Sequence, residues 1–325
     1  MNISKKLALI VPLAASLLTA AAVEYQVVPN WYKLPADRPQ IGNMHGDIAV
    51  SANGDVYVSV QDPKAGVQVY DKDGKWLRVV PNAPSDFHGF VIHKDADGAE
   101  FIYGTRLGGG NILKLTLEGK EVLNIPSSAI PDDFKAKNKE GKTRVAFTGM
   151  DVAPNGDLYI TDGYSSSFVH RFDKTGKYLK SFGGKKAPYN FTTLHKIAVD
   201  TRFTPVRIIA CDREAMRVVH MSTDGEFLGV VAKDLLAPAA ICVRGDYALV
   251  GEIGGAVSVL DKEGKTVARV GLNTEKSEVK NNQTKPEKWR PGFVTAPHGV
   301  AFNAAGDIFV SEYSVFGRIH RFNVK

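Results

Sequence analysis

The segment "PNGDLYITD" at residues 154–162 decides the fold, because the chain repeats it. Similar segments stand at 52–60 ("ANGDVYVSV"), at 304–312 ("AAGDIFVSE") and, in a more divergent form, at 244–252 ("RGDYALVGE"). Each has a Gly-Asp turn followed by alternating apolar residues, which predicts a β-strand with one buried face. Repetition of one such unit along a chain is typical of repeat architectures.

Each repeat continues with a third strand that ends in another turn: "VQVYDKDGK" (67–75), "VHRFDKTGK" (169–177) and "VSVLDKEGK" (257–265). An apolar strand precedes each Gly-Asp turn and a short fourth strand follows the third. Four antiparallel strands per unit predict the blade of a β-propeller. The units start at Gly46, His88, Thr148, His195, Ala239 and His298. The sequence therefore predicts an all-β, six-bladed propeller.

The last unit has only three strands, whereas "EYQVVP" at 24–29 is a strand without a unit of its own. We expect this N-terminal strand to complete the last blade and so remove an open sheet edge. Residues 23–325 would then form one propeller domain. Two polar inserts, Pro126–Ala146 and Leu272–Thr295, are candidate lids or rim loops.

Residues 1–22 resemble a secretory signal peptide. Lys5 and Lys6 precede an apolar run over 7–18, and small residues follow it. We expect a secreted or periplasmic protein with no membrane span in the mature chain, since no other stretch approaches 18 apolar residues. The alternative is an uncleaved anchor.

Charge and cysteine content argue against a nucleic-acid-binding protein and against a disulfide-stabilised one. The formal net charge is +6, and the basic residues are mixed with acids rather than gathered in an aromatic-interleaved stripe, so we expect no nucleic-acid binding. Two cysteines, Cys211 and Cys242, are too few for a disulfide framework and could either pair or stay as thiols. We expect a monomer.

Three histidines occupy one repeat position: His88 in "FHGFVI", His195 in "LHKIAV" and His298 in "PHGVAF". Equivalent positions converge when repeats close into a ring. Three neutral imidazoles with an open fourth position describe a catalytic zinc site, or a site for another divalent transition metal. The alternative is that they are structural, hydrogen-bonded histidines. His93, His170, His220 and His320 fall on loops or third strands and are predicted to be surface or packing residues.

The start of an innermost strand and the end of the second strand lie at the same end of an antiparallel blade. This places His45 and a second set of residues at the mouth that holds the three histidines: Gln61, Arg106, Tyr164, Arg213, Glu252 and Tyr313. A metal, a phenol and guanidinium groups around a polar cavity suit a small-molecule or peptide substrate that carries a carboxylate.

These residues resemble the NHL-repeat propellers related to peptidyl-α-hydroxyglycine α-amidating lyase. The resemblance runs from "VVPNWYKLPADRPQIG" (27–42) to the end of the chain, and "TDGYSSS" (161–167), "ACDREAMRVV" (210–219) and "APHGVAF" (296–302) are its most specific parts. It implies that His88, His195 and His298 bind a catalytic zinc. It also implies that Tyr164 takes the hydroxyl proton of the substrate and that Arg213 holds the carboxylate.

The chain departs from that family at several positions. Gln61 stands where the family has a second active-site arginine, for which Arg106 could substitute, and His45 has no counterpart. The aspartate that helps to bind a structural calcium in the family is replaced by Gly299. The alternative function is a non-catalytic NHL-repeat propeller that binds a protein or glycan. A calcium-dependent lactonase propeller is disfavoured, because calcium prefers oxygen ligands.

Overall fold

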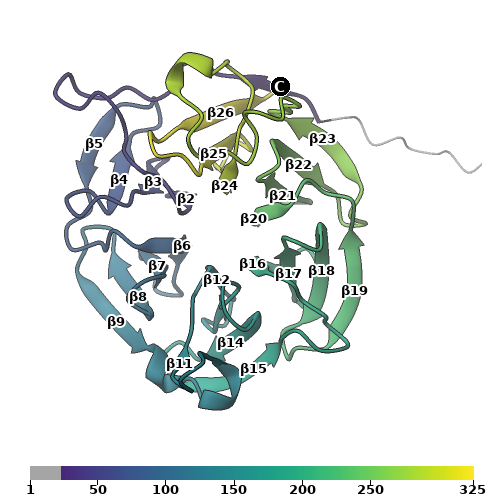
Figure 1. Ribbon diagram of the computed structural model, residues 1–325. Helices are drawn as coiled ribbons and strands as arrows, with labels where there is room; N and C mark the ends of the chain where they lie inside the picture. The colour runs from purple at the N-terminus through teal and green to yellow at the C-terminus, as the bar shows by residue number, and fades with distance from the viewer. Residues whose placement is uncertain (1–22) are drawn as a thin grey trace, which may run out of the picture.

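The computed structural model describes residues 23–325, so the predicted signal peptide lies outside the described residues. Six four-stranded antiparallel sheets are arranged in a ring around a central axis (Figure 1). The prediction of an all-β, six-bladed propeller is confirmed. Blade one consists of β2 (Ile48–Val50), β3 (Val56–Ser59), β4 (Val67–Tyr70) and β5 (Trp76–Val79). Blade two consists of β6 (Phe87–Lys94), β7 (Glu100–Arg106), β8 (Asn111–Thr116) and β9 (Glu121–Pro126). Blade three consists of β12 (Gly149–Val152), β13 (Leu158–Thr161), β14 (Phe168–Phe172) and β15 (Tyr178–Gly183).

Blades four to six follow the same order around the ring. Blade four consists of β16 (Leu194–Asp200), β17 (Arg207–Asp212), β18 (Arg217–Ser222) and β19 (Phe227–Ala232). Blade five consists of β20 (Pro238–Arg244), β21 (Tyr247–Glu252), β22 (Ala256–Leu260) and β23 (Thr266–Val270). Blade six consists of β24 (Pro297–Phe302), β25 (Ile308–Glu312), β26 (Ile319–Val324) and β1 (Tyr25–Val27).

The repeated Gly-Asp segment forms the hairpin between the first and second strands of a blade. In blade three the Gly156 N–H donates to the carbonyl of Ala153 at 2.8 Å, and Gly156 has a φ of +88°, which glycine adopts without steric cost. The strand that follows differs from the expectation of one buried face, because all four residues of β13 are buried. Leu158 packs towards blade two and Tyr159 packs towards blade four, so the neighbouring blades cover both faces.

The N-terminal strand closes the ring as expected. β1 pairs antiparallel with β26, with Tyr25 opposite Val324 and Val27 opposite Phe322. Backbone hydrogen bonds continue on either side, from Val28 to Arg321 at 2.9 Å and from Lys325 to Glu24 at 3.0 Å. β1 is therefore the outermost strand of the last blade (Figure 1).

Removal of β1 is expected to weaken the whole ring. A chain that starts at Pro29 should lose about 3 kcal/mol of unfolding free energy relative to one that starts at Val23, from lost ladder hydrogen bonds and from exposure of Tyr25, Val27 and the edge of β26. Urea unfolding of the two chains checks this, and equal midpoints would show that β1 contributes nothing to closure.

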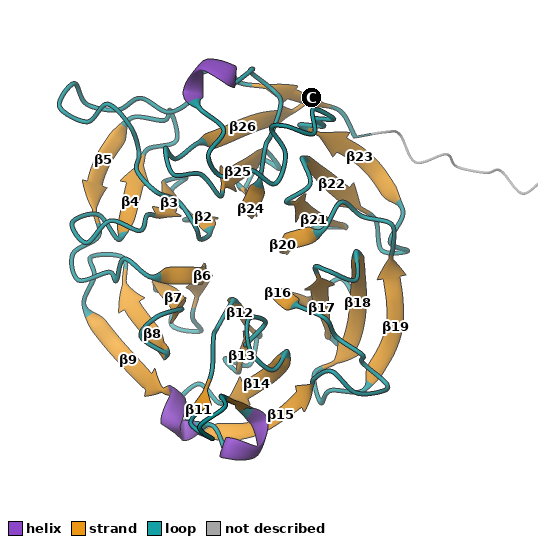
Figure 2. Cartoon of the chain, viewed as in Figure 1, coloured by secondary structure: helices purple, strands orange, loops and turns teal. Residues whose placement is uncertain are grey.

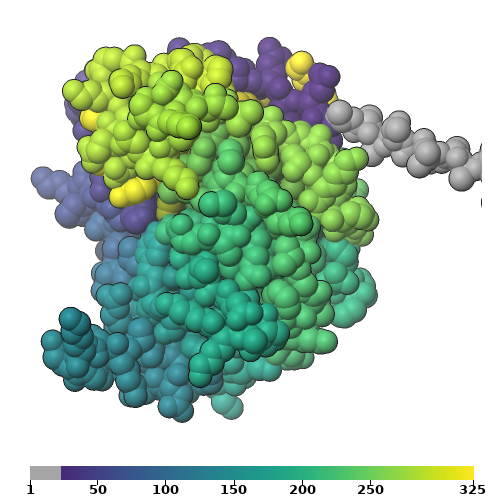
Figure 3. Space-filling model, turned by 45° about the vertical axis from the view of Figure 1, so that its right-hand side comes forward, coloured from purple at the N-terminus to yellow at the C-terminus, as the bar shows by residue number. Residues whose placement is uncertain are grey.

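The two inserts stand on the rim of the propeller. The first carries short 3-10 helices at Ser127–Ala129 and Asp132–Phe134 and a small hairpin of β10 (Ala136–Lys137) and β11 (Thr143–Arg144). The second carries one such helix, at Pro286–Lys288. Figure 2 shows the helical turns of both inserts at the rim, and Figure 3 shows the bulk of the second insert, in yellow-green, rising from the surface.

The structure also bears on the predictions about a membrane span and about the two cysteines. Within residues 23–325, the structure has no helix of the length and apolarity needed to cross a membrane. Both cysteines are free thiols, with Cys211 buried and Cys242 partly buried. The alternative that they stay unpaired therefore describes the structure.

Candidate metal centre at one mouth of the channel

Three histidines lie at the start of the innermost strands of alternate blades. They belong to β6, β16 and β24. In each, Nδ1 lies at hydrogen-bond distance from a backbone carbonyl oxygen of the next blade: His88 to Thr148 at 2.7 Å, His195 to Ala239 at 2.6 Å and His298 to Gly46 at 3.3 Å. The three acceptors occupy the same repeat position as the histidines. One orienting contact thus recurs in every second blade.

This contact determines which ring nitrogen is available. A carbonyl oxygen can only accept, so Nδ1 carries the proton of the neutral ring and Nε2 carries the lone pair. The Nε2 atoms of His88 and His298 are buried and have no hydrogen-bond partner within the described chain. The ring centroids of the three histidines lie 4.7, 5.0 and 5.1 Å apart. Buried, unpartnered nitrogens that converge in this way fit a divalent metal with a preference for imidazole.

His45 joins the same cluster from the segment that precedes β2. Its ring centroid is 4.8 Å from that of His88 and 4.8 Å from that of His298. The candidate ligand atoms of these three histidines all lie within 4.8 Å of one another. Its Nδ1 faces the Gln61 amide at 3.5 Å rather than a backbone carbonyl. His45 is therefore close enough to act as a ligand but is less firmly oriented than the other three.

Tyr164 and Arg213 lie directly beside this cluster. The Tyr164 hydroxyl is 3.0 Å from Nε2 of His195, to which it donates, and it accepts a hydrogen bond of 3.1 Å from the Arg213 guanidinium. Arg213 is in turn held by Glu214 at 2.8 Å. Burial raises the pKa of Tyr164 even though the Arg213 charge acts to lower it. The phenol is thus protonated at neutral pH in the fold as described.

A cavity of about 360 Å³ opens over Tyr164 and Arg213. Tyr313, which the repeat places at this mouth, lines the cavity, and Lys280 is an addition that the sequence did not predict. Lys280 comes from the second insert, where its N–H donates to the carbonyls of Ile253 and Thr295. Because the insert has no counterpart in the other blades, the repeat gave no means of placing this lysine. Tyr313 follows β25, at the end of a second strand, where the repeat does place residues at this mouth.

The last two predicted site residues, Gln61 and Arg106, have different surroundings. Gln61 lies next to His45 and accepts a hydrogen bond of 3.0 Å from Asn43. Arg106 is not among the residues that line the cavity, and its Nε binds Asp86 at 2.7 Å. The structure therefore does not bring Arg106 to the position where the family has its second arginine.

The environment keeps the cluster neutral. Burial, with a smaller effect from Arg213, lowers the pKa of His45 to about 4, and burial together with the neighbouring His45 lowers the pKa of His88 to about 3. Burial likewise holds the pKa of His195 and that of His298 well below the usual value. Neutral imidazole is the form that binds a metal, so protons compete weakly with a metal at neutral pH.

This environment predicts acid sensitivity of the metal-free protein. Below about pH 6.5, histidines of the unfolded chain take up protons that the folded chain resists. Stability is then complete above pH 6.5 and is lost as the pH falls towards 4, by up to about 1.4 kcal/mol per histidine per pH unit. Urea unfolding at pH 7.5, 6 and 5 measures this loss. A variant with His88, His195 and His298 replaced by alanine should lose less, and an equal loss would contradict the prediction.

Two single variants can show whether His195 or His45 is the third metal ligand beside His88 and His298. We expect His195→Ala to weaken zinc binding by more than about 100-fold, because it removes an imidazole oriented by a backbone carbonyl. We expect His45→Ala to weaken it by about tenfold, the scale of a supporting contact. Competition with a chromogenic chelator gives both affinities. The reverse order would make His45 the third ligand.

The layer directly below the histidines holds a buried ion pair. Asp47 follows Gly46 in blade one, Lys196 follows His195 in blade four, and their side chains meet across the channel. Gly149 and Gly299 make room for them: a Cβ at Gly149 would lie 2.7 Å from Cδ of Lys196, and one at Gly299 would lie 2.8 Å from Cα of Asp47.

This layer does not fit the structural calcium that the family resemblance raised. The Asp47 carboxylate is already paired with an ammonium group. A side chain at Gly299, where the family has an aspartate, would meet the backbone of blade one. Calcium needs six to eight oxygen ligands, and the described residues of this layer do not supply them.

The fold and the histidine-lined mouth define a six-bladed propeller with a candidate metal centre, and comparison with solved structures supports the propeller. A streptogramin B lyase is 15% identical with a TM-score of 0.58, and the match covers 93% of this chain and 97% of that one. Virginiamycin B lyase from Staphylococcus aureus is 14% identical, with a TM-score of 0.59 and coverage of 93% and 100%. A gluconolactonase from Xanthomonas campestris is 13% identical, with a TM-score of 0.61 and coverage of 88% and 89%.

These likenesses show the fold alone. No family model matches the chain. None of the three proteins is a peptidyl-α-hydroxyglycine lyase, so the comparisons show a β-propeller and do not single out the family that the residues resemble.

Proposed function

We propose that this protein is a metal-dependent lyase that cleaves the C–N bond of an α-hydroxy-amide substrate carrying a carboxylate. One observation carries the proposal: Nδ1 of each of His88, His195 and His298 lies against a backbone carbonyl, which leaves the lone pair on Nε2, and the three ring centroids lie within 5.1 Å of one another. The Nε2 atoms of His88 and His298 are buried without a partner in the described chain, and that of His195 accepts a hydrogen bond from Tyr164. The similar solved structures include two lyases, which supports the reaction class.

The chain's own residues divide the work between binding and proton transfer. The positive charges of Arg213 and Lys280 face the cavity and suit a substrate carboxylate. Tyr164 Oη lies between the Arg213 guanidinium and His195. In its deprotonated form, which the Arg213 charge would stabilise, Tyr164 would receive the proton of the substrate hydroxyl. A divalent metal held by the three histidines would add Lewis-acid activation of the substrate hydroxyl or carboxylate.

The reaction balances without a further reactant. The hydroxyl O–H and the C–N bond break, the C–O bond becomes a carbonyl, and the proton ends on the amide nitrogen. The products are glyoxylate and a primary amide, and no oxidant or water is consumed.

The test is turnover of N-benzoyl-α-hydroxyglycine by zinc-loaded protein, with glyoxylate measured as its hydrazone. We expect Tyr164→Phe to lower kcat by at least 100-fold, since it removes the proton acceptor. Arg213→Lys should mainly raise KM, because lysine cannot bind a carboxylate in bidentate fashion. Asp173→Asn, at an exposed turn away from the cavity, is the control.

Two outcomes would contradict the proposal. Zinc-loaded protein that releases no glyoxylate from this or any other α-hydroxyglycine compound would exclude the lyase. A protein whose biological activity survives removal of all three histidines would favour the alternative of a non-catalytic binding propeller. Export from the cytoplasm remains a prediction of the sequence, tested by sequencing the N-terminus of the secreted protein.

A further inference from the structure

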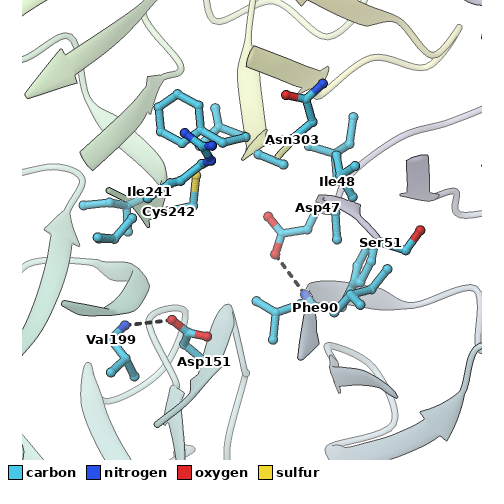
Figure 4. Close-up of a pocket in the computed structure, with 18 of the residues that line it drawn as sticks. Asp47, Ile48, Ser51, Phe90, Asp151, Val199, Ile241, Cys242 and Asn303 are labelled. Carbon is cyan, nitrogen blue, oxygen red and sulfur yellow. Dashed lines mark hydrogen bonds between the residues drawn. The ribbon is translucent and has the colours of Figure 1, made fainter. Parts of the chain in front are cut away.

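A second cavity, of about 470 Å³, lies at the other end of the channel from the histidines (Figure 4). The histidines stand at the start of the innermost strands, whereas this cavity is lined by the later residues of those strands, such as Val50, Ile92 and Val243. Its volume falls in the range of about 300–1,000 Å³ that small-molecule sites occupy.

The Asp47–Lys196 ion pair separates the two ends of the channel. Both residues line the second cavity, and each directly follows a residue of the histidine layer. Because Gly149 and Gly299 pack close against them, the partition is tight. A ligand in the second cavity therefore would not reach the histidines, and the two ends can bind different molecules.

The wall of this cavity combines apolar and charged side chains. The charged lining residues are three acids and three bases: Asp47, Glu100, Asp151, Lys94, Lys196 and Arg244. Partly exposed side chains of Val50, Ile92, Val243 and Phe302 face it from four blades. Covering such apolar surface with a ligand is favourable.

Asp151 is an acid of this wall that forms no ion pair with the described residues. The Asp151 carboxylate accepts hydrogen bonds from the Val199 N–H at 2.7 Å and the Val152 N–H at 2.8 Å, and Figure 4 shows the first of these. No Lys, Arg or His nitrogen of residues 23–325 lies within ion-pair distance of it, unlike Asp47, which is neutralised by Lys196. Burial raises the pKa of Asp151 to about 6, so it is largely ionised at pH 7.5.

The bond to Val199 gives Asp151 a structural role as well, since it joins blade three to blade four. Asp47 joins blade one to blade two in the same way, through the Phe90 N–H at 2.9 Å. The difference is that Asp47 also has Lys196. Each oxygen of Asp151 makes one hydrogen bond to the chain, and a carboxylate oxygen can accept two. Each oxygen therefore has room for one more donor.

We propose that this second cavity binds a small organic cation, an ammonium group on an aromatic or branched aliphatic body, with the ammonium on Asp151 and the body against the apolar wall. The opposite mouth suits such a ligand less, because its charged lining residues are Arg213 and Lys280 against Glu214 alone, whereas the second cavity has as many acids as bases. The proposal does not depend on the proposed lyase activity.

Calorimetric titration with phenethylammonium at pH 7.5 tests the proposal on the full chain. We expect 2-phenylethanol, which has the same body without the charge, to bind at least tenfold more weakly. Asp151→Asn should weaken phenethylammonium binding at least tenfold. Glu214→Gln, which removes a carboxylate from the opposite mouth, should leave it unchanged.

A second variant guards against misfolding, because an amide at position 151 would direct an NH₂ group at a backbone N–H. Val50→Trp keeps Asp151 and fills the cavity, and it should also abolish binding. The proposal would be overturned if phenethylammonium did not bind, if the alcohol bound equally well, or if Val50→Trp had no effect. A loss caused by Glu214→Gln would place the amine at the histidine mouth and overturn it as well.

Discussion

Replacing His88, His195 and His298 together by alanine is expected to abolish metal binding. The wild-type protein, loaded with zinc and dialysed, should retain about one metal per chain, and the triple variant should retain less than a tenth of that. The reason is that the variant loses all three carbonyl-oriented imidazoles and keeps only His45, whose Nδ1 faces an amide. Elemental mass spectrometry of the two proteins gives the result.

His93→Ala is the matched control for this experiment. His93 is a histidine of the same strand as His88, but its ring lies against Tyr103, with centroids 6.0 Å apart, and it is not part of the cluster. Its removal should leave the metal content unchanged. The triple variant should still fold, because the packed blade faces rather than the histidines form the core. Equal metal in wild type and triple variant would reduce the three histidines to structural residues.

Breaking the ion pair below the histidines is expected to have the largest effect on stability. Lys196→Met leaves the Asp47 carboxylate buried without a countercharge, and this should cost about 3–5 kcal/mol of unfolding free energy. Adding Asp47→Asn to Lys196→Met removes the unpaired charge and keeps an acceptor for the Phe90 N–H. The double variant should therefore recover at least half of the loss.

Urea unfolding of the single and double variants measures both effects. Lys72→Met is the control, because its ion pair with Asp73 is exposed to solvent and should contribute little. If Lys196→Met were no more costly than Lys72→Met, the channel pair would not be the buried, mutually dependent pair that the structure describes.

Much of the fold was predictable because the repeat is visible in the sequence. Repeated Gly-Asp turns revealed the blade unit, the six unit starts predicted the number of blades, and the unpaired strand at 24–29 predicted the closure of the ring. The blade starts predicted at Gly46 and Thr148 lie within two residues of β2 and β12. Strand burial was less accurate, because the pattern of one strand does not reveal that a neighbouring blade covers its second face.

The candidate site was predictable only where its residues occupy repeat positions. The structure brings together His88, His195, His298, Tyr164 and Arg213 from five separate strands or strand ends. A repeat position fixes the place of a side chain but not its partner. Thus Arg106 stands at the expected strand end but binds Asp86. Lys280 lies in an insert without a repeat and could not be placed at all.

The pairing of β1 with β26 has a consequence for synthesis. The last blade lacks its outer strand until β26 has been synthesised, because β1 and β26 are far apart in the described sequence. Earlier blades can form as hairpins from local contacts, but β1 must stay unpaired until all the strands between it and β26 have been made. We therefore expect the nascent protein to depend on chaperones for its first strand and to gain its full resistance to proteolysis in a single late step.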